Sequence, residues 1–307
     1  MSMSRIASLV SKAFAVADRK KNAGLTTPDE IVRFDDISYG PDPVWNTLDV
    51  YRPREAQGKL PVIIDVHGGG WVYGDKYVYQ YYCMSLAQRG FAVVNFSYRL
   101  APEHVFPASM LDMDAVVRFV LSNADKYGFD LSHVFLVGDS AGAHMVAMYC
   151  NMCTDKEYSG LLGVVPPEGF VPSAVVLNCG IYDICEMLKD PNPSVVLLKP
   201  LVKDLLGVKT LPQTLTAEQD ALLCPARYIN SSFPPAFVMT AVGDFLVRQP
   251  DCILPVLERN GVRHVFKVYG TEKNRLSHVF HCDLRLPEAK ECNDDEMDFL
   301  KAIVRGE

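Results

Sequence analysis

The sequence has no excess of basic charge, no long apolar run and no repeated or low-complexity segment. Its 307 residues carry 30 Lys and Arg against 37 Asp and Glu, a formal charge of −7, which argues against a protein that neutralises nucleic-acid phosphates. No stretch approaches the roughly 18 apolar residues of a membrane-spanning helix, so we expect no membrane span. Hydrophobic residues make up 49% of the chain, which is enough for a folded core and too much for a disordered protein.

The sequence also lacks the dense, even set of cysteines that staples small secreted domains. Its nine cysteines are scattered, so we expect a reducing compartment and a cytoplasmic location. Cys150 and Cys153 form one CxxC pair. No second pair of cysteines or histidines follows at zinc-binding spacing, and we therefore predict no metal at this pair.

A secretory signal is not indicated. Lys12 interrupts the apolar stretch that begins at Ile6, and residues 19–21 are basic where a cleavage site would need small residues. An amphipathic helix is favoured instead, because apolar residues recur at helical spacing at Ile6, Leu9, Val10, Ala13 and Phe14.

Short apolar runs alternate with helical patterns along most of the chain. Near-continuous apolar runs are typical of parallel strands covered on both faces, and their alternation with helices predicts right-handed crossovers. We therefore predict an α/β fold with a mostly parallel, eight-stranded sheet flanked by helices. The expected strands are 31–38 and 47–51, which resemble an antiparallel pair, then 61–66, 91–96, 134–137, 174–177, 236–239 and 265–268. The expected helices are 77–88, 108–122, 141–152, 250–259 and 288–304.

The segment from Tyr182 to Phe233 interrupts this alternation. It contains no strand pattern, and five prolines punctuate it. An insertion of this length in a compact fold is usually a lid or a binding element. We therefore expect it to contribute to a functional site and not to the sheet.

The motif GDSAG at residues 138–142 follows one expected strand and opens the helix after it. A strand-to-helix turn this tight holds Ser140 in a strained conformation that only small neighbours allow. The hydroxyl then lies at the positive end of a helix dipole, which favours anionic character on oxygen. The alternative is a serine that simply caps an ordinary helix. The motif therefore makes Ser140 a candidate nucleophile.

The motif HGGGW at residues 67–71 follows the preceding buried strand. Consecutive glycines let backbone N–H groups approach a ligand oxygen closely. We predict that the N–H groups of Gly69, Gly70 and Ala141 form an oxyanion hole, with His67 as a structural brace. A flexible turn would explain the glycines alone, and a phosphate cradle would need a following Gly-Lys-Ser/Thr that is absent.

A serine nucleophile needs a base, and the base needs an orienting acid, in the chain order Ser, acid, His. Asp244 follows the expected strand 236–239, at the end where α/β folds place their sites. His278 lies beyond the last strand and is the predicted base, with His281 as the fallback. These histidines and Asp283 could also be interpreted as a metal cluster, but no further ligand set is evident.

Taken together, these motifs resemble those of the hormone-sensitive-lipase-like esterases, also called bacterial lipase family IV, of the α/β-hydrolase fold. The residues that carry the resemblance are HGGGW at 67–71, YRLAPEH at 98–104, FPA at 106–108, GDSAG at 138–142, GD at 243–244 and HVF at 278–280. The resemblance implies that residues 1–307 form a single domain, with a helical cap from about 1–30 and 182–233. It also implies a possible homodimer.

The activity that the resemblance implies is hydrolysis of short to medium acyl esters through an acyl-enzyme. The expected partner is a small-molecule ester, and no metal or organic cofactor is implied. Trp71 and Tyr73 lie nearest to the glycine loop and are the expected substrate-binding residues. Two alternatives stay open: amide or formamide hydrolysis, and a non-catalytic small-molecule receptor. The complete set of Ser140, Asp244 and His278 argues against the receptor.

A few positions depart from the family pattern. Ala143 replaces a second glycine after the serine motif, Phe245 replaces a proline after the acid, Arg248 stands where an acid is common, and Val279 replaces a glycine beside the base. None of these departures removes a catalytic group, but they leave the acyl preference open.

Overall fold

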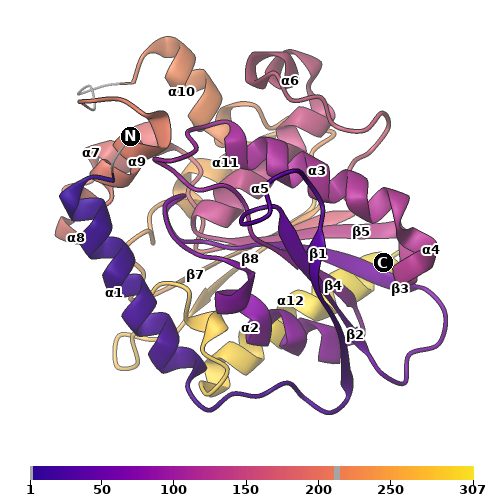
Figure 1. The fold of residues 1–307 in the computed structure, drawn as a ribbon. Coiled ribbons are helices and arrows are strands. Elements are labelled where there is room, and N and C mark those ends of the chain that lie inside the picture. The colour runs from indigo at the N-terminus through magenta and orange to yellow at the C-terminus, as the bar shows by residue number, and fades with distance from the viewer. Residues whose placement is uncertain (1–2, 211–214) are drawn as a thin grey trace.

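The computed structural model of the protein describes residues 3–210 and 215–307, and these form one eight-stranded sheet in the order β1-β2-β4-β3-β5-β6-β7-β8 (Figure 1). The strands are β1 (Ile31–Ser38), β2 (Thr47–Pro53), β3 (Leu60–Val66), β4 (Ala92–Phe96), β5 (Phe129–Asp139), β6 (Ala174–Asn178), β7 (Ala236–Ala241) and β8 (His264–Tyr269). β2 is antiparallel to β1 and β4, and all other pairs are parallel. The predicted fold class is confirmed.

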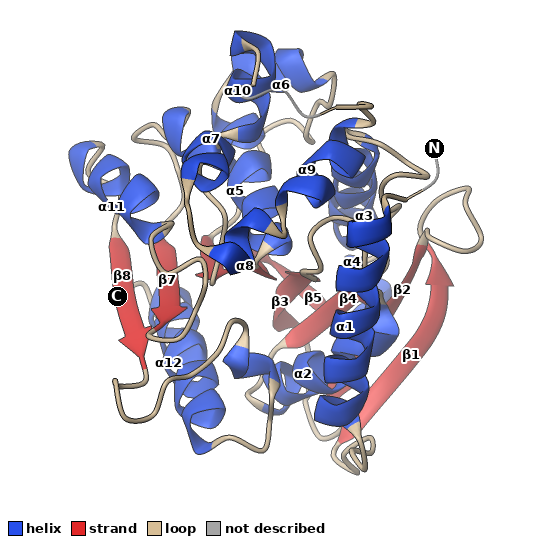
Figure 2. Cartoon of the chain, turned by 90° about the vertical axis from the view of Figure 1, so that its left-hand side faces the viewer, coloured by secondary structure: helices blue, strands red, loops and turns tan. Residues whose placement is uncertain are grey.

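Helices cover both faces of the sheet. One face packs against α3 (Ala108–Ser122), α5 (Ala141–Thr154) and α11 (Pro250–Arg259). The other face packs against α2 (Lys76–Gln88) and α12 (Pro287–Val304), which lie together on one side of the sheet in Figure 2. Short helices α4 (Ala124–Tyr127) and α6 (Lys156–Leu162) follow α3 and α5.

Alternation along the strands divides the core into these two layers. Val62 and Ile64 of β3 belong to the layer under α3 and α5, whereas Ile63 belongs to the layer under α2 and α12. In β5, Leu136 and Phe135 divide in the same way. Successive side chains of a strand point to opposite faces, so a strand that is apolar throughout must be covered twice.

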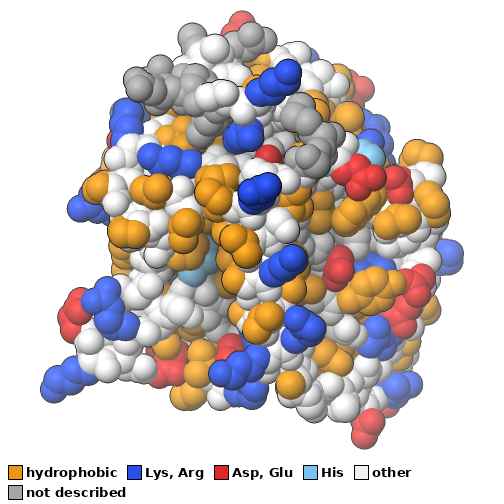
Figure 3. All heavy atoms as spheres, turned by 60° about the vertical axis from the view of Figure 1, so that its left-hand side comes forward, with side chains coloured by type: hydrophobic (Ala, Val, Ile, Leu, Met, Phe, Trp, Pro, Cys, Tyr) orange, Lys and Arg blue, Asp and Glu red, His pale blue; other side chains and the backbone are white. Residues whose placement is uncertain are grey.

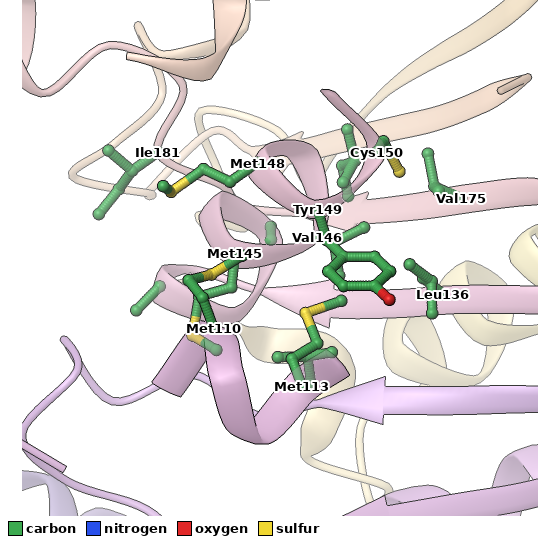
Figure 4. Close-up of a cluster of buried hydrophobic side chains, with 14 of the residues drawn as sticks. Met110, Met113, Leu136, Met145, Val146, Met148, Tyr149, Cys150, Val175 and Ile181 are labelled. Atoms are coloured by element: carbon green, nitrogen blue, oxygen red, sulfur yellow. The ribbon is translucent and has the colours of Figure 1, made fainter. Parts of the chain in front are cut away.

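Methionines fill much of the contact between α3, α5 and the sheet. Figure 4 shows Met110 and Met113 of α3 close to Met145 of α5, and Met148 of α5 beside Ile181. Methionine is unbranched and adapts to irregular gaps. The helix that begins directly after Ser140 is therefore held to the sheet by closely packed apolar side chains.

One strand is longer than its apolar run indicates. β5 begins at Phe129 and not at Val134, because Phe129 and Asp130 already pair with the start of β3 before a register irregularity. Asp130, Ser132 and His133 hide this extension, since they interrupt the apolar run on which the prediction depends. The sheet is thereby extended at the end opposite to Ser140.

The predicted N-terminal helix is present as α1 (Arg5–Asn22), but its predicted apolar face is only partly covered: Val10 packs against the core and Phe14 packs on Tyr73. Ile6 and Leu9 are 44% and 66% exposed, while Ala7 is fully buried. The helix does not lie on the sheet. Its Ser4 N–H donates to Asp204 in the 182–233 segment at 3.0 Å, and the helix packs on α9 and α2.

The described part of the 182–233 segment contains no strand. It forms the helices α7 (Ile184–Lys189), α8 (Pro193–Val196), α9 (Lys199–Leu206) and α10 (Ala217–Leu223), followed by the 3-10 turn η1 (Pro225–Arg227). A second 3-10 turn, η2 (Phe280–Cys282), precedes α12. Among the helices of residues 3–210 and 215–307, none is both long and apolar enough to cross a membrane.

A buried ion pair joins α2 to the antiparallel edge of the sheet. The Nζ atom of Lys76 lies 2.7 Å from Asp49 Oδ1 and 2.7 Å from Asp36 Oδ1. The side chains of Lys76 and Asp49 are 0% and 1% exposed. Removing one partner of such a pair leaves the other charge buried and uncompensated.

We expect Lys76→Met to lower the free energy of unfolding by about 3–5 kcal/mol, because Asp49 then lacks its counter-charge. Denaturant titration measures this change. The matched control is Lys59→Met, because Lys59 and Asp125 form an exposed pair, whose loss should cost less than about 1 kcal/mol. Equal destabilisation by the two variants would contradict this account.

Candidate active site

Ser140 lies in the turn between β5 and α5, with φ 53° and ψ −116°. A residue with a side chain adopts positive φ only at a steric cost, which the surrounding structure must impose. Here a Cβ atom added to Gly142 would lie 1.8 Å from the Val66 carbonyl oxygen, and one on Gly138 would lie 2.7 Å from the Gly142 carbonyl carbon. The glycines therefore allow the turn to pack directly on the end of β3.

The structure brings Ser140 to His278. Ser140 Oγ lies 2.9 Å from His278 Nε2, and His278 Nδ1 lies 2.8 Å from Asp244 Oδ1. When the Nδ1–H group of His278 donates a hydrogen bond to the Asp244 carboxylate, the Nε2 atom carries no proton and can accept the one from Ser140. The three residues are far apart in the sequence, and the ends of β5, β7 and β8 place them together.

A short bridge aligns the acid with the base. Gly243 pairs with Ser277 in an isolated parallel bridge, and the Gly243 N–H donates to the Leu276 carbonyl at 2.9 Å. Asp244 and His278 are the next residues on the two paired segments, so their side chains meet. The pairing of β7 with β8 thus continues into the loops that carry these two groups.

Asp244 is held as a carboxylate. Its Oδ1 atom accepts the Leu246 N–H at 2.8 Å, and its Oδ2 atom accepts the Thr240 hydroxyl at 3.1 Å. Burial alone would raise the pKa of Asp244, but the adjacent His278 and the Leu246 N–H lower this pKa below its ordinary value. The negative charge is therefore present to orient the imidazole.

His281, the fallback for the base, does not lie beside Ser140. Its ring is fully buried against Tyr82, with centroids 5.2 Å apart, and burial lowers its pKa to about 3. It is therefore neutral and packed into the core on the α2 side. The geometry places His278, the first choice for the base, beside the serine, and places the fallback elsewhere.

In the glycine loop at 68–70, one backbone N–H group donates hydrogen bonds within the described part of the chain and two donate none. The Gly68 N–H donates to Asp139 Oδ1 at 3.0 Å and to the Tyr79 hydroxyl oxygen at 3.1 Å. Gly69 and Gly70 have φ angles of 117° and 61°, and their N–H groups donate no hydrogen bond within the described part of the chain. Ala141 is the first residue of α5, so its N–H also has no acceptor within that helix.

His67 braces this loop from behind. Its ring is fully buried and stacks on Tyr98 with centroids 4.1 Å apart, and its Nδ1 atom lies 2.7 Å from the Gly68 carbonyl oxygen. Burial lowers the pKa of His67 to about 4, so the ring is neutral at pH 7. Its contacts are with the loop backbone, as expected for a structural residue.

Ser140 and His278 open into a cavity of about 310 Å³. Trp71 and Tyr73, the two expected substrate-binding residues, both line it. The other apolar side chains of its wall come mainly from α1, from the 182–233 segment and from the loops beside the histidine: Phe14, Ile181, Leu198, Leu201, Phe245, Val279, Phe280 and Leu286. The wall is therefore mostly apolar, as in many small-molecule sites.

Sequence reasoning missed the part of the wall that α1 supplies. Phe14, Asp18 and Lys21 line the cavity, and Asp18 accepts the Tyr73 hydroxyl at 2.9 Å and pairs with Lys21 at 2.8 Å. Lys21 belongs to the basic run that argued against a signal peptide, and nothing in its local pattern marks it as different from Lys20. Only the cap that the family resemblance implies, which includes residues 1–30, predicts that this helix lies near the site.

The exposed sides of α1, α8 and α9 surround this region. Figure 3 shows hydrophobic side chains gathered on this face among basic ones. Ile6, Leu9 and Val16 of α1 and Val196 of α8 are each more than 40% exposed. The apolar surface that α1 does not bury therefore lies on the same face.

Comparison with known proteins agrees with this geometry. The family model BD-FAE matches residues 48–253, which is more than half of the chain. The carboxylesterase NlhH of Mycobacterium tuberculosis is 30% identical over 246 residues, which cover 78% of this chain and 74% of that protein. The chain belongs to the hormone-sensitive-lipase-like carboxylesterase family of the α/β-hydrolase fold.

Other members of this carboxylesterase family are similar over different shares of their length. Esterase LipC of Mycobacterium tuberculosis is 30% identical over 222 residues, which cover 72% of this chain and 51% of that one. The chain spans about half the length of LipC and 48% of the related LipM. Esterase B from Lactobacillus rhamnosis superposes with a TM-score of 0.86 at 25% identity, covering 98% of this chain and 96% of that chain.

Two departures from the carboxylesterase family pattern lie in the site. Phe245, which replaces a proline after the acid, packs on the His278 ring with centroids 4.2 Å apart. Val279 follows the base with φ 51°, a conformation that would suit glycine better. The two departures thus place larger side chains directly beside the imidazole.

We expect Ser140→Gly to be more stable than Ser140→Ala by about 1 kcal/mol, because glycine adopts the positive φ of this turn without steric cost. Thermal or denaturant unfolding measures the order. The control pair is Ser11→Gly and Ser11→Ala inside α1, where alanine should be the more stable by about 0.5–1 kcal/mol. The same order at both positions would show that the turn is not strained.

Proposed function

We propose that the protein is a serine carboxylic ester hydrolase that acts on short to medium acyl esters through an acyl-enzyme. The observation that carries this proposal is the hydrogen-bonded chain from Ser140 through His278 to Asp244, with distances of 2.9 Å and 2.8 Å, at the wall of an apolar cavity. Family membership supports the same reaction, and no resident cofactor is needed for it.

In this mechanism His278 removes the proton of Ser140 as the serine oxygen attacks the ester carbonyl. Asp244 fixes the tautomer of the imidazole and stabilises its positive charge. The free N–H groups of Gly69 and Gly70, with that of Ala141, would bind the developing oxyanion, where one donor contributes on the order of 3 kcal/mol.

The second half of the reaction uses the same groups. His278 returns its proton to the leaving alcohol and then activates a water molecule, which releases the acid from Ser140. The positive end of α5 favours negative charge at the serine oxygen. The apolar wall limits the access of bulk water, which strengthens these charge interactions.

We further propose that about residues 1–30 and 182–233 act as a cap that sets the length of the acyl chain. Phe14 of α1, and Leu198 and Leu201 of the insertion, line the cavity. A Cβ atom on Gly70 would lie 2.5 Å from Leu201 Cδ1, so Leu201 closes the cavity directly above the glycine loop. A cavity of about 310 Å³ lies at the small end for ligand sites.

A structural relative supports a short acyl chain. Esterase B from Lactobacillus rhamnosis has been solved inhibited by a C4-C4 tributyrin phosphonate, and that structure superposes on this chain with a TM-score of 0.84 at 26% identity. The shared fold extends over 98% of this chain. We therefore place butyrate esters within the proposed substrate range.

Ser140→Ala should abolish hydrolysis of p-nitrophenyl butyrate, and Asp244→Asn should lower kcat by about 10⁴-fold, because the imidazole then loses its correct tautomer. Asp251→Asn, on the exposed side of α11, is the control and should keep full activity. Undiminished turnover by Ser140→Ala would refute the mechanism.

The same assay separates the open alternatives. A matched butyranilide turned over faster than the ester would favour amide hydrolysis. Failure of a fluorophosphonate probe to label Ser140 would favour a non-catalytic receptor.

Leu201→Ala should shift the preference towards longer acyl chains, because it removes the side chain that closes the cavity over Gly70. We expect the ratio of kcat/KM for octanoate over butyrate to rise about 10-fold, the scale of a few methylene contacts. Leu161→Ala on the exposed side of α6 is the control. If the octanoate-to-butyrate ratio of kcat/KM is the same as in the native protein, Leu201 does not border the acyl pocket.

A further inference from the structure

Four side chains with metal-binding atoms converge in the 182–233 segment, away from the catalytic groups. They are Asp183 and Cys185 at the start of α7, and Asp220 and Cys224 at the end of α10, and one ligand atom of each lies within 4.8 Å of all the others. None of the four is among the residues that line the cavity. The proposed ester hydrolysis does not use them.

The spacing of these atoms is close to that of a tetrahedral site. Asp220 Oδ1 lies 2.8 Å from Cys185 Sγ and 3.1 Å from Cys224 Sγ, and Asp183 Oδ1 lies 3.4 Å from Cys224 Sγ. Around a tetrahedral zinc ion, neighbouring sulfur and oxygen ligands are about 3.5 Å apart. A small outward movement of the side chains would therefore open space for one ion.

Arg227 turns the two carboxylates towards the thiols. Its guanidinium lies 3.1 Å from Asp183 Oδ2 and also pairs with Asp220 Oδ2. The Oδ2 atoms are thus occupied, and the Oδ1 atoms of both residues face the two sulfurs. Partners that orient the ligands in this way are a regular part of protein metal sites.

Charge and ligand type indicate which ion would fit. Two carboxylates face one guanidinium, so the cluster keeps an excess of negative charge before either thiol ionises. Magnesium and calcium prefer oxygen ligands alone, whereas two thiolates with two further ligands in tetrahedral geometry suit zinc. Asp183 Oδ1 also accepts the Glu186 N–H at 2.9 Å, which fixes its position without using all its acceptor capacity.

We propose that Asp183, Cys185, Asp220 and Cys224 bind one Zn²⁺ ion that fastens α10 to α7. Each thiol gives its proton to solvent on binding, and the ion takes two sulfur and two oxygen ligands. The site is closed by protein ligands, so its role is structural. It would hold the segment that contains Ile181, a cavity-lining residue two positions before Asp183.

The other side of this segment is already fixed. The Gln249 side-chain oxygen accepts the Tyr182 N–H at 2.7 Å and the Asp183 N–H at 3.0 Å. Zinc would add a second attachment, from α7 to α10, to the thiol–carboxylate contacts and the Arg227 ion pairs that already join them. The proposed zinc site affects the stability of the segment, and its test does not depend on whether the protein hydrolyses esters.

The test uses the full-length protein, stripped of metal with a chelator under reducing conditions and titrated with Zn²⁺ against a chromophoric competitor. We expect one tight site per chain and a rise in Tm on zinc addition. Co²⁺ in place of Zn²⁺ should give intense visible bands of tetrahedral coordination and a thiolate charge-transfer band. Zinc should also protect Cys185 and Cys224 from alkylation, mapped by mass spectrometry on the native protein.

Variants separate this site from the remaining cysteines. Cys185→Ser and Cys224→Ser should each abolish the charge-transfer contribution of one thiolate and weaken Zn²⁺ binding at least 10-fold. Arg227→Met should weaken it about 10–100-fold, as for other partners that orient ligands. Cys153→Ser, in α5 and outside the cluster, is the control and should bind zinc as the native protein does.

Three results would overturn the proposal. The first is the absence of a stoichiometric zinc site in the native protein, and the second is unchanged binding in both cysteine variants. The third is a Cys185–Cys224 disulfide that forms in air and persists in excess zinc. If a cysteine variant fails to fold, the cobalt spectrum and the alkylation map of the native protein still decide the question.

Discussion

The close approach of the β5–α5 turn to the end of β3 is the constraint on which the site depends. Gly142 lies so near the Val66 carbonyl that no Cβ atom fits between them. This contact holds Ser140 at positive φ and places the start of α5 against the end of β3, from which the glycine loop continues. The nucleophile and the proposed oxyanion donors are therefore positioned by one backbone contact and not by separate loops.

The rest of the molecule either supports this contact or closes the space above it. The two-sided core fixes the ends of the parallel strands, and the Gly243–Ser277 bridge carries that order into the loops of Asp244 and His278. The insertion and α1 then supply wall, which is mostly apolar but includes Asp18 and Lys21, and no proposed catalytic group. In the proposed function, reaction chemistry and substrate selection thus depend on different parts of the chain.

Local sequence signals were sufficient where the chemistry depends on backbone conformation. The strand and helix patterns, the serine turn and the glycine loop all follow from residues that are adjacent in the chain, and the structure places Ser140, His278 and Asp244 within hydrogen-bonding distance. What the sequence could not predict depends on contacts between distant segments. The buried side of α1 is one such feature, because its partners in α9 and the Tyr73 loop are not encoded near it.

The same limit applies to single side chains. Phe245 was recognised as a departure, but only the fold shows that its ring packs on His278. Cys185 and Cys224 are distant in the sequence and match no metal-binding spacing, so their convergence appears only when α7 and α10 meet. The motif at Cys150 and Cys153, which does have suggestive spacing, lies along one helix.

The position of α1 has a consequence for biosynthesis. The N–H of Ser4, the residue that caps α1, donates to Asp204, which is 200 residues further along the chain. Until that part has been translated, the start of α1 lacks both Asp204 and the surface of α9 on which the helix packs. Contacts with so large a sequence separation form late, since a long loop must close first. The start of α1 is therefore among the last parts of the fold to be fixed.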